Sequence, residues 1–375
     1  MRTLFDPTVL HGLALPNRFV RSATWEGLAD PQGRVTPPLT ELMVTLARNG
    51  VGLIITGYAF VDPAGQSSPG QLAAADEGCV AGLQAMVQAV HAAGGRIALQ
   101  LVHGGACATP ELTGRSGLGP SEGGVNGQSP CRAMTAADCS TVAPAFAAAA
   151  TRAQRAGFDA VQLHAAHGFL LSQFLSPAFN RRTDGYGGPL AHRARLLLEV
   201  AQQVRAAVGP AYPLLVKLNS EDFLEGGMTR AEAVEVAAWL AEASIDAIEL
   251  SGGTVASPQT LLPPRPGKLA TPEAEVYYRE AARLYKQRVP IPLMLVGGIR
   301  SYVVAEQLVA EGITDYVALA RPLIAEPDLV RRWAAGDHRP AACGSCNGCF
   351  RPALAGQGVY CVRLDPQGDL VGASA

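Results

Sequence analysis

The chain has 375 residues and 48% of them are hydrophobic, so it can bury a large core. Lysine and arginine number 30 and aspartate and glutamate 32, a net charge of −2, which lacks the basic surplus of a nucleic-acid-binding protein. No apolar run approaches the roughly 20 residues that span a membrane. The N-terminal segment carries Asp6, Pro7 and His11 where a secretory signal needs an unbroken apolar core. We therefore expect a cytoplasmic protein without nucleic-acid or membrane partners.

A short apolar run followed by an amphipathic helical segment is repeated along the chain. The apolar runs occupy 17–24, 51–58, 96–103, 160–167, 214–220, 247–253, 293–299 and 316–322. Helical periodicity follows at 39–50, 79–95, 191–209, 230–244 and 303–312, and the alanine-rich run 142–150 predicts a further core helix. Strands that alternate with helices pair in parallel through crossovers. Eight units predict an α/β fold, a closed (β/α)8 TIM barrel, with an open doubly wound sheet as the alternative.

Two segments interrupt this repeat. Residues 104–140 follow the third strand and are rich in Gly, Ser, Pro and Thr, and residues 254–275 follow the sixth strand. Both lie after the C-terminal ends of their strands, where active sites of such barrels form, so we expect long loops that cover the barrel mouth. We divide the chain into a barrel, residues 1–340, and a short Cys-rich tail, residues 341–375.

The seventh and eighth strands end in residues typical of a phosphate site. Gly297 and Gly298 would let backbone N–H groups approach an anion, and Arg321 could bind its oxygens with a forked guanidinium. The loops after these two strands recurrently hold phosphate in this fold. The alternative is a tight turn beside a surface arginine.

Lys217 lies within an apolar strand, and Gln100 lies at the end of another. A lysine that points into the barrel needs an anionic partner to keep its charge. A flavin ring that gains negative charge would be such a partner, and Gln100 could bond the same ring through its donor and its acceptor. Alternatively, Lys217 forms a buried ion pair with Glu221 or Asp222.

His164 and His167 lie three residues apart at the end of the fourth strand. Two such side chains can direct two donors at one substrate oxygen. A zinc pair is an alternative, but no third ligand is evident and the HExxH motif is absent. A structural role is the remaining alternative.

Seven segments in chain order resemble the old yellow enzyme family. They are PNRFVRSAT (16–24), GVGLIITGYAFV (50–61), QLVHGG (100–105), HAAHGFLLSQFLSPAFNRRTDGYGG (164–188), VKLNSEDF (216–223), LVGGIRS (295–301) and LARPLIAEPDL (319–329). The resemblance implies an FMN-containing (β/α)8 barrel that takes hydride from NAD(P)H and passes it to an activated alkene or a similar acceptor.

The resemblance also implies roles for individual residues. Near the flavin ring it places Ala23, Thr24, Trp25, Gly57 and Tyr58. Gln100 and Lys217 would bond the pyrimidine edge of the ring, and the phosphate would be held by Gly297, Gly298, Ala320 and Arg321. His164 and His167 would bind the carbonyl or nitro oxygen of the substrate, in a pocket that Trp25, Tyr58 and Phe169 complete.

Phe169 departs from the family pattern. The usual proton donor at this position is a tyrosine, and phenylalanine has no proton to donate. Either solvent or another residue protonates the product, or the chemistry shifts toward isomerisation or dehydrogenation.

The tail carries a second departure. Cys343, Cys346, Cys349 and Cys361 resemble the iron–sulfur segment of the 2,4-dienoyl-CoA reductase branch, with two residues instead of three between the second and third cysteine. Four thiolates at this spacing suit a [4Fe–4S] cluster or zinc, and reduced structural cysteines are the alternative. The large flavin- and NADPH-binding region of that branch does not follow the barrel in this sequence, so we expect electrons to come directly from NAD(P)H or from an outside partner.

We therefore predict an FMN-dependent NAD(P)H oxidoreductase of the ene-reductase type, acting on a small electrophilic molecule. A flavin-dependent isomerase or dehydrogenase of a specialised metabolite is an alternative motivated by Phe169. A flavin-binding electron-relay or assembly subunit is an alternative motivated by the cysteine tail. A homo-oligomer is compatible with each of these.

Overall fold

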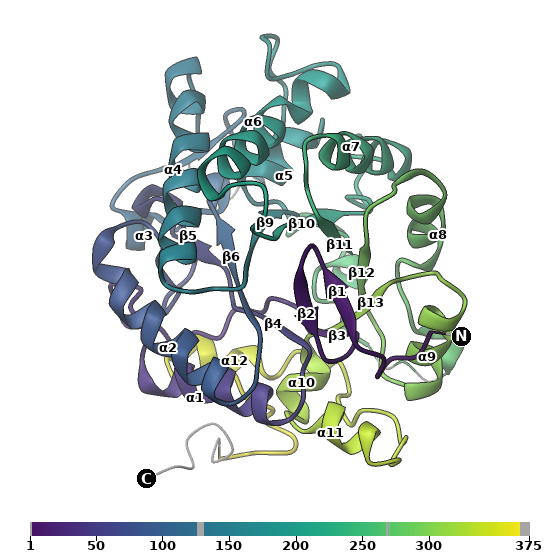
Figure 1. Ribbon diagram of the computed structural model, residues 1–375. Helices are drawn as coiled ribbons and strands as arrows, with labels where there is room; N and C mark the ends of the chain where they lie inside the picture. Colours follow the sequence, from purple (N-terminus) through teal and green to yellow (C-terminus); the bar gives the residue numbers. More distant parts are fainter. Residues whose placement is uncertain (1, 126–130, 268, 270, 368–375) are drawn as a thin grey trace.

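A computed structural model describes residues 2–125, 131–267, 269 and 271–367 (Figure 1). Its central sheet is a ring of parallel strands in which β3 pairs with both β13 and β4, and β4 pairs with β6. The ring consists of β3 (Phe19–Arg21), β4 (Leu53–Ile55), β6 (Ile97–Val102), β9 (Ala160–Ala165), β10 (Leu214–Asn219), β11 (Ala247–Ser251), β12 (Leu293–Val296) and β13 (Tyr316–Leu319). The predicted (β/α)8 barrel is confirmed, and each of the eight predicted runs contains one of these strands.

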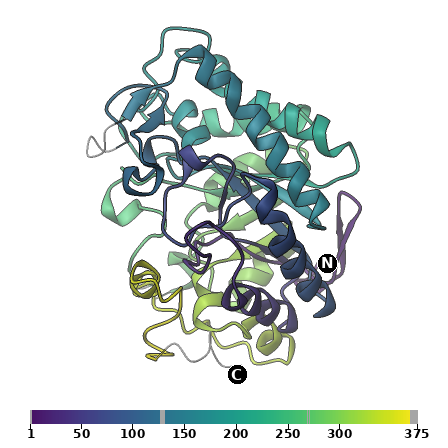
Figure 2. The ribbon, with the colours of Figure 1, turned by 90° about the vertical axis from the view of Figure 1, so that its left-hand side faces the viewer.

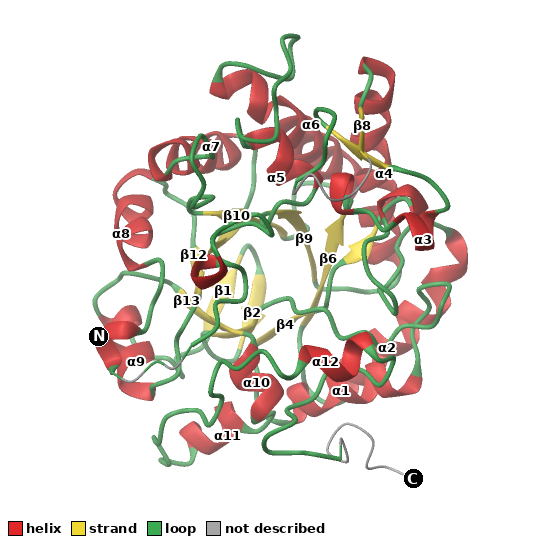
Figure 3. Ribbon diagram, turned by 180° about the vertical axis from the view of Figure 1, so that it is seen from behind, coloured by secondary structure: helices red, strands yellow, loops and turns green. Residues whose placement is uncertain are grey.

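Helices form the outer layer around the strands, as Figure 3 shows. They are α1 (Pro37–Arg48), α2 (Val80–Ala92), α4 (Ala136–Arg155), α6 (Leu190–Val208), α7 (Arg230–Glu242), α8 (Arg279–Arg288) and α9 (Tyr302–Ala310), with α10 (Arg321–Ala325) and α11 (Leu329–Ala334) after the last strand. Every helix predicted from periodicity is present. Capping boxes begin two of them, at Thr135 with Asp138 and at Thr229 with Glu232. None of the helices in the described part of the chain is both long and apolar enough to cross a membrane.

An antiparallel hairpin closes the N-terminal end of the barrel. It consists of β1 (Thr8–Leu10) and β2 (Leu13–Leu15), and it lies over the strands in the centre of Figure 1. Its Leu10 and Leu15 are buried against inward-facing strand residues, among them Val20, Leu215 and Met294. Side chains alternate along a strand, so every second residue of each strand faces this interior. The interior of the barrel next to the hairpin is therefore filled by apolar side chains, and the predicted polar site residues lie toward the other end.

The loops at the C-terminal ends of the strands contain short elements. These are β5 (Ala59–Phe60), η1 (Pro63–Gly65), η2 (Glu77–Cys79), η3 (Gly105–Cys107), α3 (Pro110–Thr113), β7 (Gly117–Gly119), β8 (Cys131–Ala133), α5 (Leu170–Leu175), η4 (Gln259–Leu261) and η5 (Pro272–Ala274). The segment predicted as a loop to residue 140 ends earlier, because the capping box at Thr135 starts α4 at Ala136.

The tail returns to the C-terminal side of the barrel. Its helix α12 (Phe350–Leu354) and Val359 pack with Trp25 and Ile324, and the N–H of Val359 donates to the carbonyl of Glu26 at 2.8 Å. Figure 2 shows the hairpin and α12 on opposite sides of the molecule. The tail therefore lies at the end of the barrel that carries the predicted site.

Candidate active site

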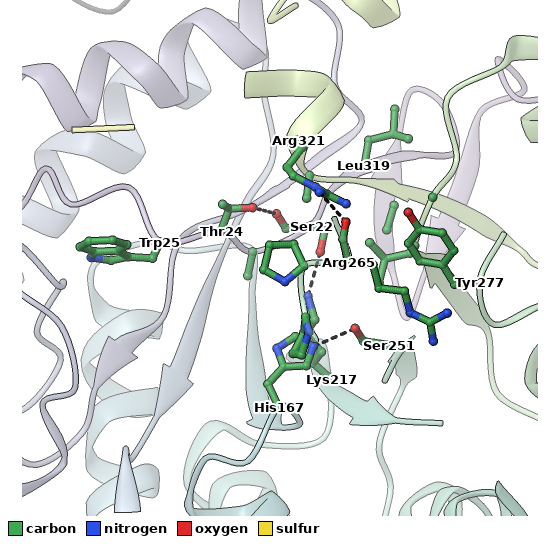
Figure 4. A pocket seen from close by; sticks show the side chains of 18 of the residues that line it. Ser22, Thr24, Trp25, His167, Lys217, Ser251, Arg265, Tyr277, Leu319 and Arg321 are labelled. Carbon is green, nitrogen blue, oxygen red and sulfur yellow. Dashed lines mark hydrogen bonds between the residues drawn. The ribbon is translucent and has the colours of Figure 1, made fainter. Parts of the chain in front are cut away.

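A cavity of about 340 Å³ opens among the C-terminal ends of the strands, within the usual size range of ligand pockets (Figure 4). Of the predicted barrel-site residues, the ones that line it are Ala23, Thr24, Trp25, Tyr58, Gln100, His164, His167, Phe169, Lys217, Gly297, Gly298, Ala320 and Arg321. In Figure 4, His167 and Lys217 lie on one side of the cavity and Arg321 on the other. The structure thus brings together residues from seven strand ends that are up to 298 positions apart, from Ala23 to Arg321.

Gly57 is the predicted residue that does not line this cavity. Its N–H donates to Oε1 of Glu26 at 2.7 Å, and a side chain at this position would overlap the Glu26 carboxylate. Glu26 also pairs with Arg21 at 3.0 Å. Burial raises the pKa of Glu26, while the Arg21 charge opposes that shift. The glycine is therefore needed to admit a buried carboxylate behind the strand end.

Lys217 is paired inside the barrel, but neither with Glu221 nor with Asp222. Its Nζ lies 3.0 Å from Oε1 of Glu249 and 2.8 Å from Oγ of Ser22. Lys217 and Glu249 are register partners on β10 and β11, so their side chains point the same way. The predicted alternative was wrong because Glu221 lies beyond the strand, where it pairs with Arg230, and Asp222 accepts from Asn219 and the Met228 N–H.

A chain of hydrogen bonds extends from this ion pair to Gln100. Nε2 of Gln162 donates to Glu249 at 2.9 Å, and Nε2 of Gln100 donates to Oε1 of Gln162 at 2.7 Å. Oε1 of Gln100 is buried on the cavity wall and has no hydrogen-bond partner among the described residues. An unpaired buried acceptor is costly, so this oxygen is suited to a ligand N–H group.

The two histidines form one edge of the cavity. Their ring centroids are 5.2 Å apart, and Nε2 of His167 lies 2.8 Å from Oγ of Ser251. His167 has a positive φ of 64°, and its N–H is held by Oδ1 of Asn219 at 3.1 Å. The Ala166 N–H donates to Nδ1 of His164 at 3.3 Å, which leaves the proton on Nε2 of His164.

Both imidazoles are neutral near pH 7. Burial lowers the pKa of His164 and of His167 well below 6.5, and the charge of Lys217 acts in the same direction on both. Such rings donate one hydrogen bond each without carrying a charge into the cavity. They therefore suit a substrate oxygen that becomes negative only during the reaction.

Phe169 and Tyr58 complete the wall beside the histidines. The Phe169 ring lies 4.8 Å from the His164 ring and 5.3 Å from the Tyr58 ring, between centroids. The Tyr58 hydroxyl lies 2.9 Å from Oγ of Ser68, and burial raises the pKa of Tyr58 to about 12. Tyr58 is thus a protonated phenol that lines the same cavity as Phe169.

The predicted phosphate residues lie on the opposite side. Gly297 and Gly298 have positive φ values of 116° and 79°, a conformation that glycine adopts readily. Nη1 of Arg321 donates to the Arg265 carbonyl at 2.8 Å and to Oδ1 of Asn347 at 2.7 Å. Arg321 forms none of the ion pairs found among the described residues, although it is only 8% exposed.

The two long loops predicted to cover the barrel mouth differ in whether they line the cavity. The loop after β11 lines the cavity with Val255, Pro263, Pro264 and Arg265. In contrast, no described residue of 104–140 lines it. That segment forms its own β7–β8 pair and is held to the loop after α5 by Arg182, which donates to the carbonyl of Pro120 at 3.1 Å. The expectation that it covers the mouth is therefore not met by its described residues.

The four tail cysteines line one small cavity of about 20 Å³ beside Arg321. In the described part of the chain, no group of three His, Cys, Asp or Glu side chains is arranged to hold a metal ion. Burial raises the pKa of Cys349 to about 12. The tail thus brings Cys343, Cys346, Cys349 and Cys361 together without forming a ligand set.

Several site residues escaped sequence reasoning. Glu249 and Gln162 are polar residues inside otherwise apolar strands, and each lies two positions from a residue that faces the apolar end of the barrel. Because alternate residues of a strand point to the same side, this spacing of two could have predicted that Glu249 and Gln162 face the barrel interior. Arg265 and Arg300, which also line the cavity, lie in loops and carry no such signal.

Comparisons with known proteins identify the family of this chain. The model of the NADH:flavin oxidoreductase / NADH oxidase family matches residues 3–339. An NADH oxidase from Thermoanaerobacter brockii is 37% identical over 353 residues, which cover 92% of this chain and 53% of that protein. A 4,4'-dithiodibutanoate disulfide reductase from Rhodococcus erythropolis is 32% identical, with 97% of this chain and 95% of that protein covered.

A solved structure of a 2-naphthoyl-CoA reductase in complex with 2-naphthoyl-CoA is similar at a TM-score of 0.90 and 28% identity, covering 99% of this chain and 58% of that chain. The chain thus spans about half the length of the NADH oxidase and of the naphthoyl-CoA reductase. These names agree with the predicted class, a flavin-dependent NAD(P)H oxidoreductase. A solved old yellow enzyme homologue from Zymomonas mobilis has the same fold, at a TM-score of 0.76 and 24% identity, covering 89% of this chain and 93% of that chain. Together with the family match, this confirms the predicted resemblance to the old yellow enzymes. The chain belongs to the NADH:flavin oxidoreductase / NADH oxidase family.

Proposed function

We propose that the protein is an FMN-dependent oxidoreductase that passes hydride from NAD(P)H to an activated alkene or a similar electrophile. One observation carries this proposal. A single cavity contains two neutral histidines and two groups that lack a partner among the described residues: an amide acceptor, Gln100 Oε1, and an arginine with no carboxylate beside it, Arg321. These groups complement a flavin ring, a phosphate and a carbonyl or nitro oxygen, respectively.

The donors and acceptors that line the cavity match those of FMN. Gln100 and Lys217 would hold the pyrimidine edge of the ring, and Gly297, Gly298 and Arg321 would hold the phosphate. The Glu249 carboxylate pairs with Nζ of Lys217 at 3.0 Å and holds this side chain across the barrel. When bound, FMN would supply the hydride chemistry, which no side chain of the cavity can supply alone.

His164 and His167 would bind the oxygen of the acceptor. Hydride arriving at the β-carbon shifts negative charge to that oxygen, and fixed N–H donors stabilise the charge more in the transition state than in the ground state. Ser251 and the Ala166 N–H hold the two rings, and Asn219 holds the backbone N–H of His167, so little reorganisation is needed. The pair is thus pre-arranged for an oxyanion.

The test is reconstitution followed by turnover. The FMN-free protein should bind FMN and regain a flavin spectrum, and the complex should oxidise NADH or NADPH faster when a nitroalkene or cyclohexenone is added. Failure of FMN to bind, or oxidation that no electrophile accelerates, would contradict the proposal. The protein with its cavity blocked by Gly298→Trp is the matched control.

Phe169 favours a second candidate, a flavin-dependent isomerase. Phe169 fills the wall between His164 and Tyr58 and offers no proton to an enolate-like intermediate. A substrate anion that waits for a proton could instead return a hydride to the flavin after bond rotation, which would give back the alkene in its other geometry with no net reduction. Product formation without net consumption of NAD(P)H would support isomerisation, and a one-to-one ratio of NAD(P)H to product would support reduction.

We also propose that the four tail cysteines bind a [4Fe–4S] cluster or zinc. The support is their convergence on one cavity and the thiolate chemistry that both metals prefer. Since they form no ligand set as they stand, binding requires the side chains to reorient. Iron, sulfide and zinc analysis of anaerobically purified protein tests this, with Cys131→Ser as the matched control for Cys346→Ser.

A further inference from the structure

Arg265 projects from the loop after β11 and is held between aromatic rings. Its guanidinium carbon lies 4.8 Å from the ring centroid of Phe223, 4.7 Å from that of Tyr277 and 5.1 Å from that of Tyr278. Figure 4 shows the side chain beside Tyr277 on the cavity wall. Three faces around one cation fix its position without neutralising its charge.

The charge of Arg265 has no counter-ion among the residues that the structure describes. Its Nε and Nη2 atoms are buried and have no hydrogen-bond partner, and Arg265 forms none of the ion pairs found in the described part of the chain. Elsewhere the buried Arg193 pairs with Glu232, and the partly buried Arg205 pairs with Asp246. Buried guanidinium N–H groups without a partner are costly, so an anionic ligand that accepted from Nε and Nη2 would stabilise Arg265.

The surroundings of Arg265 connect it to the predicted phosphate residues. A side chain at Gly297 would touch the Tyr278 ring, and one at Gly298 would touch the Tyr277 ring. The same two rings hold the guanidinium. In addition, Arg321 donates to the Arg265 carbonyl at 2.8 Å. The two arginines and the two glycines are therefore parts of one wall.

We propose that Arg265 is a second arginine for the phosphate of the flavin nucleotide and acts together with Arg321. This inference rests on the proposed function, because it assumes that FMN is the ligand. A planar guanidinium presents paired N–H donors to phosphate oxygens, and its fixed position reduces the entropy lost on binding. Neither residue changes chemically, so the role is one of binding only.

The experiment compares FMN with riboflavin, which has the same ring and no phosphate. Dissociation constants are measured by flavin fluorescence quenching on the FMN-free full chain, for the wild type, Arg265→Gln and Arg265→Lys. Arg195→Gln is the matched control, because Arg195 also stacks on a tyrosine, Tyr186 at 5.6 Å, but lies on α6 and does not line the cavity.

Arg265→Gln should weaken FMN binding by about tenfold or more, the scale of one hydrogen bond to a charged group, and riboflavin binding by less than about twofold. Arg265→Lys should restore part of the lost FMN affinity, and Arg195→Gln should leave the dissociation constants of both flavins unchanged. Unchanged riboflavin binding also shows that the variant retains its cavity.

Three results would overturn the inference. They are an equal loss for both flavins, no loss for FMN, or a rise in KM for NADPH alone, which would assign Arg265 to the nicotinamide nucleotide. A wild-type protein that binds neither flavin would instead overturn the proposed function.

Discussion

The barrel mouth and the cysteine tail both gather reactive side chains, but they do so by different means. In the mouth, His164, Lys217 and Glu249 are register partners on three neighbouring strands. The backbone ladder places them side by side before any ligand binds. In the tail, the cysteines lie on irregular chain that is held by side chains such as Arg300, which donates to the Cys343 carbonyl and to Ser345. Neighbouring strands alone bring the first set together, whereas the described tail residues do not form a ligand set as they stand.

The largest effect should come from breaking the ion pair inside the barrel. Glu249→Gln leaves Lys217 buried without an opposite charge, which typically costs about 3–5 kcal/mol of unfolding free energy. Urea denaturation measures this loss. The control is Glu221→Gln, whose partner Arg230 is 42% exposed, and it should cost at most about 1 kcal/mol. Equal losses of unfolding free energy in the two variants would show that the ion pair inside the barrel contributes no more to stability than the one at the surface.

Removing either histidine should slow turnover of a carbonyl acceptor at least about tenfold, since each donor to an oxyanion is commonly worth 10²–10³. His164→Ala and His167→Ala are measured with cyclohexenone under single-turnover conditions. Reduction of the enzyme by NAD(P)H should change less, because that step has no acceptor oxygen to stabilise. Wild-type rates in both variants would make the pair structural.

Removing the arginine on the opposite wall should weaken cofactor binding. Arg321→Ala is expected to cost about 1.5–3 kcal/mol of FMN binding free energy, the scale of a charge-assisted hydrogen bond. Isothermal titration of the FMN-free protein gives the value. Riboflavin is the control ligand, and an identical loss for it would show that Arg321 does not contact the phosphate.

A smaller effect on the rate is expected at Phe169, where the sequence departs from the family pattern. Phe169→Tyr adds one hydroxyl beside His164 and should raise cyclohexenone reduction several-fold or more, because general acid assistance commonly supplies 10²–10⁴. FMN binding should not change. Tyr58→Phe is the complementary variant, since Tyr58 keeps its proton and lines the same cavity. If Tyr58→Phe slows the reaction and Phe169→Tyr leaves it unchanged, Tyr58 already supplies the proton.

The smallest effect is expected in the tail. Cys346 is exposed and does not line the large cavity, so Cys346→Ser should change the dissociation constant of FMN by less than about twofold. Metal content should fall in the same variant if the tail binds a cluster or zinc. Loss of FMN together with metal would show that the barrel mouth and the tail depend on each other.

The sequence by itself determined the barrel and most of its mouth. Repeated apolar runs and amphipathic segments specify strands and helices through local periodicity, and parallel strands bring their C-terminal ends to one side. Hence Gln100, His164, Gly298 and Arg321 could be assigned to one cavity from their place at strand ends. Only the position of each residue along its strand was needed for this assignment, because the barrel fold brings the C-terminal ends of all its strands to one side.

Tertiary structure decided the partners. Glu249 pairs with Lys217 because β10 and β11 are in a register that no local pattern specifies, and the nearer carboxylates in sequence have other partners. Arg265 reaches the cavity because the loop after β11 folds over Tyr277 and Tyr278, whereas the described part of 104–140 does not line it. Loop paths and strand register depend on packing between distant residues, and for that reason they were visible only in the folded chain.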